Sequence, residues 1–310
     1  MYNNLMLIDE KTYERIMRKR NELDKLRPFN KGVLLNLQES FRVSMIYNSN
    51  AIEGNSLTLS ETKLVLEEGI TIGGKSLKEH LEVTNHSKAI DFVDSLVHKP
   101  KIEAIDVLNL HAVILDRIDP DNAGYYRRCA VRISGTDYAP PNAAKVPQLM
   151  QEVYNLLNTH GEPIEISAKI HQKFVAIHPF IDGNGRTARL LMNLYLMRHG
   201  YPPVIILRAE RKKYIRSIME EQLTENEKQF VTFVAKAVER SLDIYLDSLG
   251  TEAKEYLSLS EAAKISRNRY SEEYLSLLAR TGKIGAVKFG RDWKITKEAL
   301  EEYEKEHQNK

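Results

Sequence analysis

Apolar residues follow helical spacing along almost all of this 310-residue chain. In SAKIHQKFVAI, Ile170, Phe174 and Ile177 stand at i, i+4 and i+7, so they share one face of a helix. Pro179 predicts that this helix ends at about His178, because the residue before a proline avoids the helical region. Similar patterns predict further helices over residues 10–26, 33–53, 60–68, 76–98, 103–118, 146–158, 186–199, 209–223 and 226–248.

One segment, residues 129–147, departs from this spacing. The string CAVRISGTDYAPPNAAKVP alternates at its start and then carries Gly135 and the pair Pro140-Pro141. Alternation followed by turn residues predicts a short β-hairpin or an extended loop. A plain surface connection is the ordinary interpretation of such a segment. The alternative is that an exposed strand edge takes up an extended peptide here by strand addition.

A boundary is predicted near residues 249–258, where Gly250 favours the end of a long helix. Beyond it, SLSEAAKIS and SEEYLSLLAR predict two short helices. The string IGAVKFGRDWKIT predicts a hairpin that turns at Gly290, and KEALEEYEKE predicts a closing helix. We therefore expect a small separate domain at the C-terminal end.

Composition limits the class of protein but does not indicate its function. At about 100–200 residues per domain, the length predicts two domains, and 42% hydrophobic with 28% charged residues is typical of a globular protein. The net charge of +2 means that any basic surface must be local. Cys129 is the only cysteine, which fits a reducing compartment. Because neither a secretory signal nor an apolar run of about 18 residues is present, we expect a cytoplasmic protein with no membrane partner.

The stretch HPFIDGNGRTAR, residues 178–189, joins two predicted helices. Gly183 and Gly185 permit positive φ and close backbone approach, so several amides can converge on an anion at a helix N-terminus. Arg186 and Arg189 stand at i and i+3, on one face of the first helical turn. Two guanidinium groups beside such amides suit a polyphosphate better than a single carboxylate.

Two more side chains of this stretch supply candidate chemistry. Asp182 offers the hard oxygen ligand that Mg²⁺ takes from a protein while it also binds phosphates. His178 titrates near neutrality, which makes it the candidate general base. An HP dipeptide or a GNG turn taken alone is ordinarily a structural corner. The whole string, however, predicts a site for a Mg²⁺-nucleotide with a base ready to activate a hydroxyl.

Residues 178–189 fill the motif HxFx[D/E]GNGRxxR at every fixed position, and here the chain resembles the Fic-domain family. The resemblance extends from about residue 45 to about residue 240. It includes Tyr125-Tyr126-Arg127, the loop VRISGTDYAPP and the run LLMNLYLMRHGYPPVII. It implies a mainly α fold, a Fic-type helical bundle with a short β-hairpin flap. It also implies transfer of AMP from ATP, with Mg²⁺, to a Ser, Thr or Tyr hydroxyl of a target protein.

The resemblance also implies a role for each position of the motif. His178 would deprotonate the target hydroxyl, Asp182 would bind Mg²⁺, and Phe180 would anchor the loop in the core. The α- and β-phosphates would lie against Asn184 and the amides of Gly183 and Gly185. The remaining nucleotide-binding residues would be Arg186 and Arg189 at the outer phosphates and Tyr214 at the adenine. The flap that aligns the target would consist of Val131, Arg132, Ile133, Ser134, Gly135, Thr136, Asp137 and Tyr138.

Upstream, in YNSNAIEGNSL, Ser49 and Glu53 stand one turn apart on a helix that Gly54 can end. A solvated glutamate is the ordinary interpretation of such a residue. The string nevertheless matches the inhibitory pattern of the Fic family, [S/T]xxxE[G/N]. The match implies that Glu53 pairs with Arg189, the arginine that the γ-phosphate needs, so the resting protein is autoinhibited. Relatives that also remove AMP imply a second role, in which Glu53 orients a water molecule for de-AMPylation.

The C-terminal residues 258–310 resemble the winged helix-turn-helix of excisionase and MerR-like proteins. Between residues 264 and 297, nine basic residues stand against three acidic ones. In that resemblance the helix near 271–280 would enter a groove of DNA and the hairpin would be the wing. Glu272 and Glu273 on this helix oppose phosphate contact. DNA and a protein partner are therefore both candidates.

We thus expect an N-terminal helical region over residues 1–100 with an inhibitory helix at about 45–54. A Fic catalytic core over 101–248 and a winged helix-turn-helix domain over 258–310 would follow. The leading hypothesis is an autoinhibited protein adenylyltransferase, which also de-AMPylates in one version and forms a homodimer, as family members often do. The alternative is a nucleotide-sensing, DNA-binding transcriptional regulator with little or no transferase activity.

Overall fold

The computed structural model describes residues 7–29, 31–133, 136, 138–224, 226–249, 256–266, 269–281, 283–289 and 292–307. The chain divides into two compact units, Met1–Leu246 and Asp247–Lys310. The first unit contains residues 178–189 and the upstream stretch that carries Glu53.

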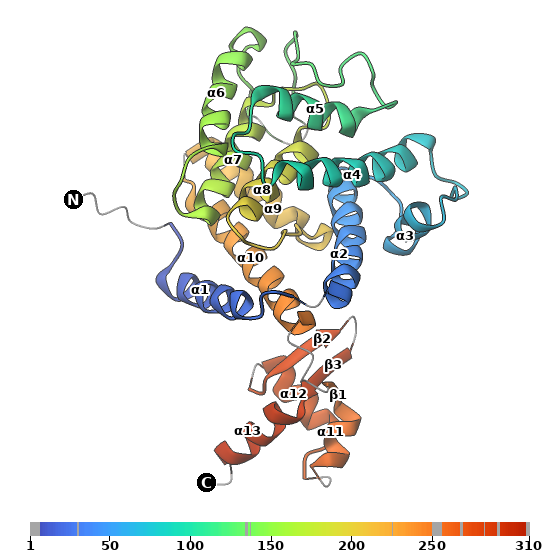
Figure 1. The fold of residues 1–310 in the computed structure, drawn as a ribbon, viewed down its shortest axis with the longest axis vertical. Coiled ribbons are helices and arrows are strands. Elements are labelled where there is room, and N and C mark those ends of the chain that lie inside the picture. The colour runs from blue at the N-terminus through green and yellow to red at the C-terminus, as the bar shows by residue number, and fades with distance from the viewer. Residues whose placement is uncertain are drawn as a thin grey trace, which may run out of the picture. The chain divides into compact units, whose positions relative to one another are not determined.

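Helices build almost all of the first unit (Figure 1). Two short 3₁₀ turns, Ala143–Lys145 and Arg208–Glu210, precede α6 and α9. None of the helices in the described part of the chain is long and apolar enough to cross a bilayer. The helices are α1 (Glu10–Lys25), α2 (Lys31–Ile52), α3 (Leu59–Glu67), α4 (Leu77–Leu96), α5 (Ala104–Leu115), α6 (Val146–Leu157), α7 (Pro163–Ile177), α8 (Asn184–Arg198), α9 (Arg211–Thr224) and α10 (Lys228–Leu249).

Local sequence signals explain where several of these helices begin and end. At the start of α4, the side chains of Ser76 and Glu79 each bind the other's backbone N–H, which forms a capping box. Helix α7 begins at Pro163, a position where the missing N–H has no helical partner to lose. The same helix ends just before His178, whose φ of 50° is left-handed. The predicted end of this helix before Pro179 is therefore confirmed.

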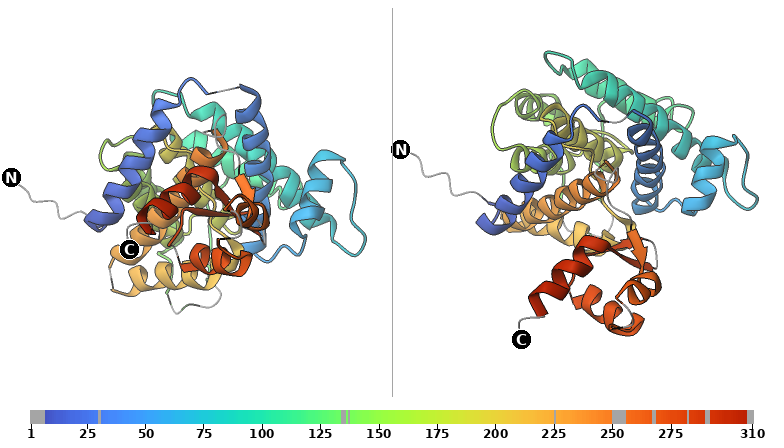
Figure 2. Two further views of the ribbon diagram at one scale, coloured as in Figure 1. Left: turned by 90° about the horizontal axis from the view of Figure 1, so that it is seen from below. Right: turned by 60° about the horizontal axis from the view of Figure 1, so that its bottom comes forward.

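Helix α8 lies at the centre of the first unit, where it packs on α7, α4, α5 and α2 (Figures 1 and 2). Residues 186–196 of this helix are all buried. Among them are the polar side chains of Arg186, Arg189 and Asn193. Because a buried polar group is costly unless it is hydrogen-bonded, partners for these side chains must come from the surrounding helices.

The flap differs from the predicted β-hairpin. Among its described residues, 131–133, 136 and 138–142, none is in a strand, so the extended-loop alternative holds for them. Ser134, Gly135 and Asp137 lie outside the described residues. The loop is held by a side chain, since the Arg127 guanidinium donates to the carbonyl oxygens of Cys129 and Pro141. Those carbonyls are thereby satisfied without the ladder of a β-sheet.

The second unit contains β1 (Tyr256–Ser258), α11 (Leu259–Ile265), α12 (Glu272–Thr281), β2 (Ala286–Phe289), β3 (Asp292–Thr296) and α13 (Lys297–His307). The predicted pair of short helices, hairpin and closing helix are confirmed, and β1 is an additional strand. Its antiparallel sheet has the order β1-β3-β2. Leu275, Leu278, Ile295 and Leu300 form the centre of its apolar core. Gly250 and Gly290 lie outside the described residues.

Candidate active site

The loop between α7 and α8 is closed by one of its own side chains. The backbone N–H of Phe180 donates to Asn184 Oδ1 at 3.0 Å, and Asn184 Nδ2 donates to the Phe180 carbonyl at 2.9 Å. Phe180 is fully buried, which confirms its expected role as an anchor. Both ends of the Asn184 amide are engaged in this brace, so its expected phosphate contact remains a prediction.

His111, for which the sequence predicted no role, packs against the loop between α7 and α8. The ring of His111, on α5, stacks on Phe180 with the centroids 3.5 Å apart. Its Nδ1 accepts from the Gly124 N–H at 3.0 Å, so its Nε2 donates to the Asp182 carbonyl at 2.9 Å. Burial lowers the pKa of His111 to about 4, which keeps the ring neutral and this arrangement intact.

His178 stands at the C-terminal end of α7, beside the N-terminus of α8. Burial lowers its pKa, so the ring is neutral at pH 7. Its Nδ1 lies 3.4 Å from the Val175 carbonyl, and because a carbonyl only accepts, this contact places the proton on Nδ1. Nε2 is then the basic nitrogen. The backbone of His178 is held by Arg127, whose Nε donates to the His178 carbonyl at 2.7 Å.

Gly183 and Gly185 bring neighbouring groups close to the first turn of α8. Gly183 has a φ of 77°, and a Cβ there would lie 3.2 Å from His111 Nε2. A Cβ on Gly185 would lie 2.3 Å from Glu53 Oε1. The Glu53 carboxylate therefore lies against the start of α8, where an anion is favoured by the free amides and the helix dipole.

Arg189 connects α8 to the end of α2. Its Nη2 lies 2.8 Å from Glu53 Oε1, and it also donates from Nε to Ser49 Oγ at 3.0 Å and from Nη2 to the Ser49 carbonyl at 2.9 Å. Burial by itself would lower the pKa of Arg189, but Tyr214 and Glu53 outweigh it and raise that pKa. The structure thus brings together Ser49, Glu53 and Arg189, as the sequence analysis expected, while Gly54, with a φ of 105°, follows the end of α2.

Arg186 lies on the other side of this turn, next to the candidate metal ligand. Its guanidinium pairs with Glu82 on α4 at 3.4 Å and with Asp182 at 3.3 Å. Lys78, also on α4, lies 3.7 Å from Asp182. Burial would raise the pKa of Asp182, but Arg186, the Gly183 N–H and Lys78 outweigh it and lower that pKa. Asp182 is therefore a carboxylate at neutral pH.

Tyr214 faces the protein interior rather than an open surface. It is 2% exposed, and its hydroxyl lies 2.8 Å from His171 Nε2 and 3.3 Å from Arg189 Nη1. In this arrangement it orients Arg189, and its expected contact with adenine remains a prediction. On the flap, the Tyr138 hydroxyl donates to the Ala176 carbonyl at 3.3 Å, which holds the loop beside the end of α7.

The site offers few protein ligands to a metal ion. Within the part of the chain that the structure describes, no group of three or more His, Cys, Asp or Glu side chains is arranged to hold a metal. Asp182 supplies one ionised carboxylate next to the amides and arginines of the loop. One carboxylate completed by phosphate oxygens and waters is a common way for a protein to bind Mg²⁺ with a nucleotide.

Comparisons with known proteins agree with this geometry. Residues 101–196 match the model of the Fic/DOC family. "Protein adenylyltransferase Fic" of Drosophila melanogaster is 39% identical over 245 residues, which cover 77% of this chain and 49% of that protein. The chain therefore spans about half the length of the curated relatives it matches.

Solved structures extend the agreement to the fold. Fic-1 of C. elegans has a TM-score of 0.71 and 33% identity, with coverage of 78% of this chain and 74% of that one. A Fic family protein from Desulfovibrio desulfuricans, at 22% identity, has a TM-score of 0.68 and covers 95% of this chain and 98% of its own. The latter likeness concerns the fold alone.

Proposed function

The chain belongs to the Fic/DOC family, and from this premise we propose that it is a protein adenylyltransferase. It would transfer AMP from ATP to a Ser, Thr or Tyr hydroxyl of a target protein. The name of the Drosophila melanogaster relative, "Protein adenylyltransferase Fic", supports this activity. The observation that carries the proposal is the position of a neutral His178 beside the start of α8, where glycines stand at 183 and 185 and two arginines follow.

In the proposed reaction, His178 removes the proton from the target hydroxyl. The hydroxyl oxygen attacks the α-phosphorus of ATP, the bond to the β-phosphate oxygen breaks, and pyrophosphate leaves. Transfer of this kind depends on positioning and charge neutralisation more than on covalent help from the protein. The base is needed because a neutral hydroxyl is a weak nucleophile at pH 7. Arg127 fixes the backbone of His178, so it is a positioning residue.

Mg²⁺ would be held by the Asp182 carboxylate together with the phosphates of ATP. When bound, the ion neutralises phosphate charge and so favours the departure of pyrophosphate. The lowered pKa of Asp182 supports this role, since a ligand to Mg²⁺ must be ionised. Lys78 and Arg186, which pair with Asp182 here, carry charges that would contribute to binding the phosphates.

We propose further that Glu53 inhibits the resting protein. Its carboxylate takes one nitrogen of Arg189 and lies against Gly185. A phosphate at the start of α8 would clash with the Glu53 side chain and be repelled by its negative charge. ATP would therefore bind in an unproductive pose. The reverse reaction is a related proposal, in which Glu53 orients a water molecule toward the AMP-protein bond while His178 protonates the departing hydroxyl.

The second unit is proposed to be a winged helix-turn-helix domain. Its order of two short helices, hairpin and closing helix supports this. Exposed Glu272 and Glu273 at the start of α12, with exposed Asp292 nearby in a shallow pocket, favour contact with protein over contact with DNA phosphates. A winged helix that binds DNA through α12 would instead lose affinity steeply as salt rises.

The test of the activity uses four forms of the full chain: wild type, Glu53→Gly, His178→Ala and the double variant. Each is incubated with Mg²⁺, host lysate and ATP labelled on the α- or on the γ-phosphate. We expect Glu53→Gly to incorporate the α-label well above wild type and neither His178 variant to do so. Incorporation of the γ-label would indicate phosphate transfer instead. No incorporation by any form would contradict the proposal and favour a nucleotide-sensing regulator.

A further inference from the structure

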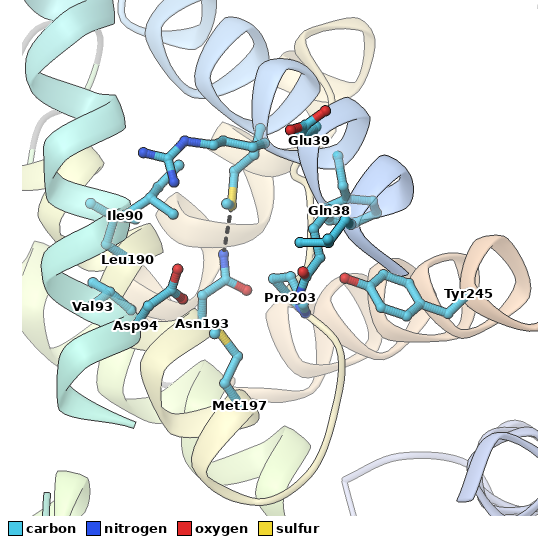
Figure 3. Close-up of a pocket in the computed structure, with 14 residues that line it drawn as sticks. Gln38, Glu39, Ile90, Val93, Asp94, Leu190, Asn193, Met197, Pro203 and Tyr245 are labelled. Atoms are coloured by element: carbon cyan, nitrogen blue, oxygen red, sulfur yellow. Dashed lines mark hydrogen bonds between the residues drawn. The ribbon is translucent and has the colours of Figure 1, made fainter. Parts of the chain in front are cut away.

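A cavity of about 260 Å³ lies between α2, α4, α8 and α10, and none of residues 178–189 lines it (Figure 3). Its floor is buried and apolar, with Phe41 and Met45 from α2, Val93 from α4 and Leu190 from α8. Apolar cavities between the helices of a bundle, lined with a few polar groups, are common small-molecule sites. The question is which chemistry its polar groups select.

The uncharged polar residues of the lining are Gln38, Asn193 and Tyr245, and Asp94 stands at the rim. Tyr245 reaches in from α10 with its hydroxyl foremost, and its ring meets Phe41 edge to face at 5.5 Å (Figure 3). Burial raises the pKa of Tyr245, and the charge of Asp94 on α4 raises it further. Neither the Tyr245 hydroxyl nor the Asp94 carboxylate has a hydrogen bond or ion pair with any residue that the structure describes.

The charge at the rim is negative. Its one cation, Arg42, is already paired through both nitrogens with Asp91, at 2.6 and 2.7 Å. Asp94 and Glu39 are the acidic residues of the lining, and Glu39 likewise has no ion pair among the described residues. Both carboxylates are exposed, and Arg42 partly offsets the charge of Asp94. An apolar floor below a rim that carries two carboxylates and one guanidinium suits a ligand with an apolar body and one positive head group.

Three residues of the cavity lining also border a second, smaller void beside Arg189. This void has a volume of about 10 Å³, and the shared residues are Met45, Leu190 and Asn193. The same void is lined by Ser49 and Arg189. Asn193 also donates to the Met45 sulfur at 3.5 Å, which links α8 to α2 (Figure 3). The α2 wall of the cavity is thus one helical turn from the serine that binds Arg189.

We propose that this cavity binds a small cationic amphiphile, an aliphatic or aromatic amine whose ammonium group pairs with Asp94 and whose apolar part packs on Phe41 and Met45. Such a ligand bridges α2 to α4 and α10 in the arrangement in which Ser49 and Glu53 hold Arg189. A ligand favours the conformation that it fits, so the amine stabilises the arrangement with Arg189 paired. The expected effect of the bound amine on catalysis is inhibition. This effect rests on the proposed function, whereas binding of the amine does not.

Three probes with one chain length separate the head group from the apolar body: n-hexylamine, n-hexanol and hexanoate. Each is titrated calorimetrically into the full-length protein at neutral pH. We expect the amine to bind about two- to fivefold more tightly than the alcohol, because the pair with Asp94 is exposed, and hexanoate to bind most weakly. Asp94→Asn lowers the affinity for the amine to about that for the alcohol. Glu14→Gln, which removes an exposed acid of α1, leaves the preference unchanged.

A second variant and a second measurement keep the two parts of the proposal separate. Ile90→Phe fills the cavity and abolishes binding of n-hexylamine and n-hexanol, with circular dichroism to show that the variant is folded. Hydrogen exchange of wild type should slow at residues 46–54 when n-hexylamine is bound. Equal affinity for the three probes, or affinities unchanged in both variants, would overturn the site. Binding without slower exchange at residues 46–54 would overturn the link to Arg189.

The activity measurement is the last step. n-Hexylamine should lower the adenylylation rate of wild type but not that of Glu53→Gly, in which the pair it stabilises is absent. Equal inhibition of both forms would contradict an effect through α2. Because binding and exchange need no catalysis, a catalytically inactive chain would refute the proposed function and leave the amine site standing.

Discussion

Glu53 and Arg189 meet at 2.8 Å, one at the end of α2 and the other in the first turns of α8. Arg189 is buried, whereas 38% of the Glu53 side chain is exposed. The arginine is also held by Ser49 and Tyr214, so Glu53 is only one of its partners. A partly exposed glutamate on a buried arginine that has other partners supports the proposal that Glu53 inhibits the resting protein and can be released.

The charge and the bulk of Glu53 can be separated by Glu53→Gln. Glutamine keeps the volume against Gly185 but loses the charge that pairs with Arg189. We expect an adenylylation rate between those of wild type and Glu53→Gly, because a charge-assisted pair is worth about 1.5–3 kcal/mol more than no pair. Initial rates of α-label incorporation measure this. A rate for Glu53→Gln equal to that of wild type would contradict the role given to the charge.

Arg127→Lys tests the positioning of the general base. Arg127 donates to the carbonyl oxygens of His178, Cys129 and Pro141, and a lysine ammonium cannot reach all three from one position. In the Glu53→Gly background we expect kcat to fall by about tenfold, since a small misplacement of a catalytic group is costly. The KM for ATP should change by less than about twofold. Arg18→Lys, on the exposed face of α1, is the matched control, and a rise in KM alone would refute the assignment.

Gly183→Ala should destabilise the fold. The φ of 77° strains any residue with a Cβ, and that Cβ would lie 3.2 Å from His111 Nε2. We expect a loss of about 1–3 kcal/mol in the free energy of unfolding, measured with urea. Gly73→Ala is the control, because a Cβ there has nothing within 4 Å. Equal stability of the two variants would show that the α8 start tolerates a side chain.

The pH dependence of catalysis follows from His178. Burial lowers its pKa from the usual 6.5, and the charge of Glu53 partly opposes this. In Glu53→Gly the pKa of the free enzyme should therefore be lower still. We expect kcat/KM for ATP to rise with pH, to reach half of its maximum below pH 6.5 and to be flat near pH 7. A midpoint above this value would argue against a buried neutral base.

The pH dependence of stability tests the buried histidine His111. Its pKa is lowered to about 4, so below about pH 6.5 the unfolded chain binds a proton that the folded protein does not. The free energy of unfolding should then fall as pH falls from about 6.5 toward 4, by up to about 1.4 kcal/mol per unit for this group. His111→Phe keeps a ring against Phe180. Its free energy of unfolding should depend on pH less steeply, by the equivalent of up to one proton. Urea unfolding between pH 5 and about 7 measures it, and an unchanged slope would count against the burial of a neutral ring.

The helices and the loop at residues 178–183 could be predicted because their signals are local. Apolar spacing places the buried face of α7, and Pro179 marks its end within the same few residues. The flap shows where local reasoning fails. Alternation at its start predicts a strand, yet the carbonyls of Cys129 and Pro141 are satisfied by Arg127. A strand needs a pairing partner, and alternation does not reveal whether one is there.

Residues that support the site from other helices carried no signal in the sequence. His111 on α5, and Lys78 and Glu82 on α4, stand at positions where helical spacing alone indicates nothing about the loop. Asn184 and Tyr214 were expected at the nucleotide, and the structure uses both within the protein, as a loop brace and as a partner of Arg189. Their side chains have more than one possible partner, and only packing selects among them.

The sequence by itself determined the helices, the order of groups in residues 178–189 and, through the family pattern, the pairing of Glu53 with Arg189. Only the tertiary structure decided which charge meets which in the rest of the site. Arg186 pairs with Glu82 and Asp182 pairs with Lys78, and both of these partners are on α4. The physical reason is that periodicity sets which side of a helix is buried, whereas the identity of the helix that covers it depends on how all the buried faces pack together.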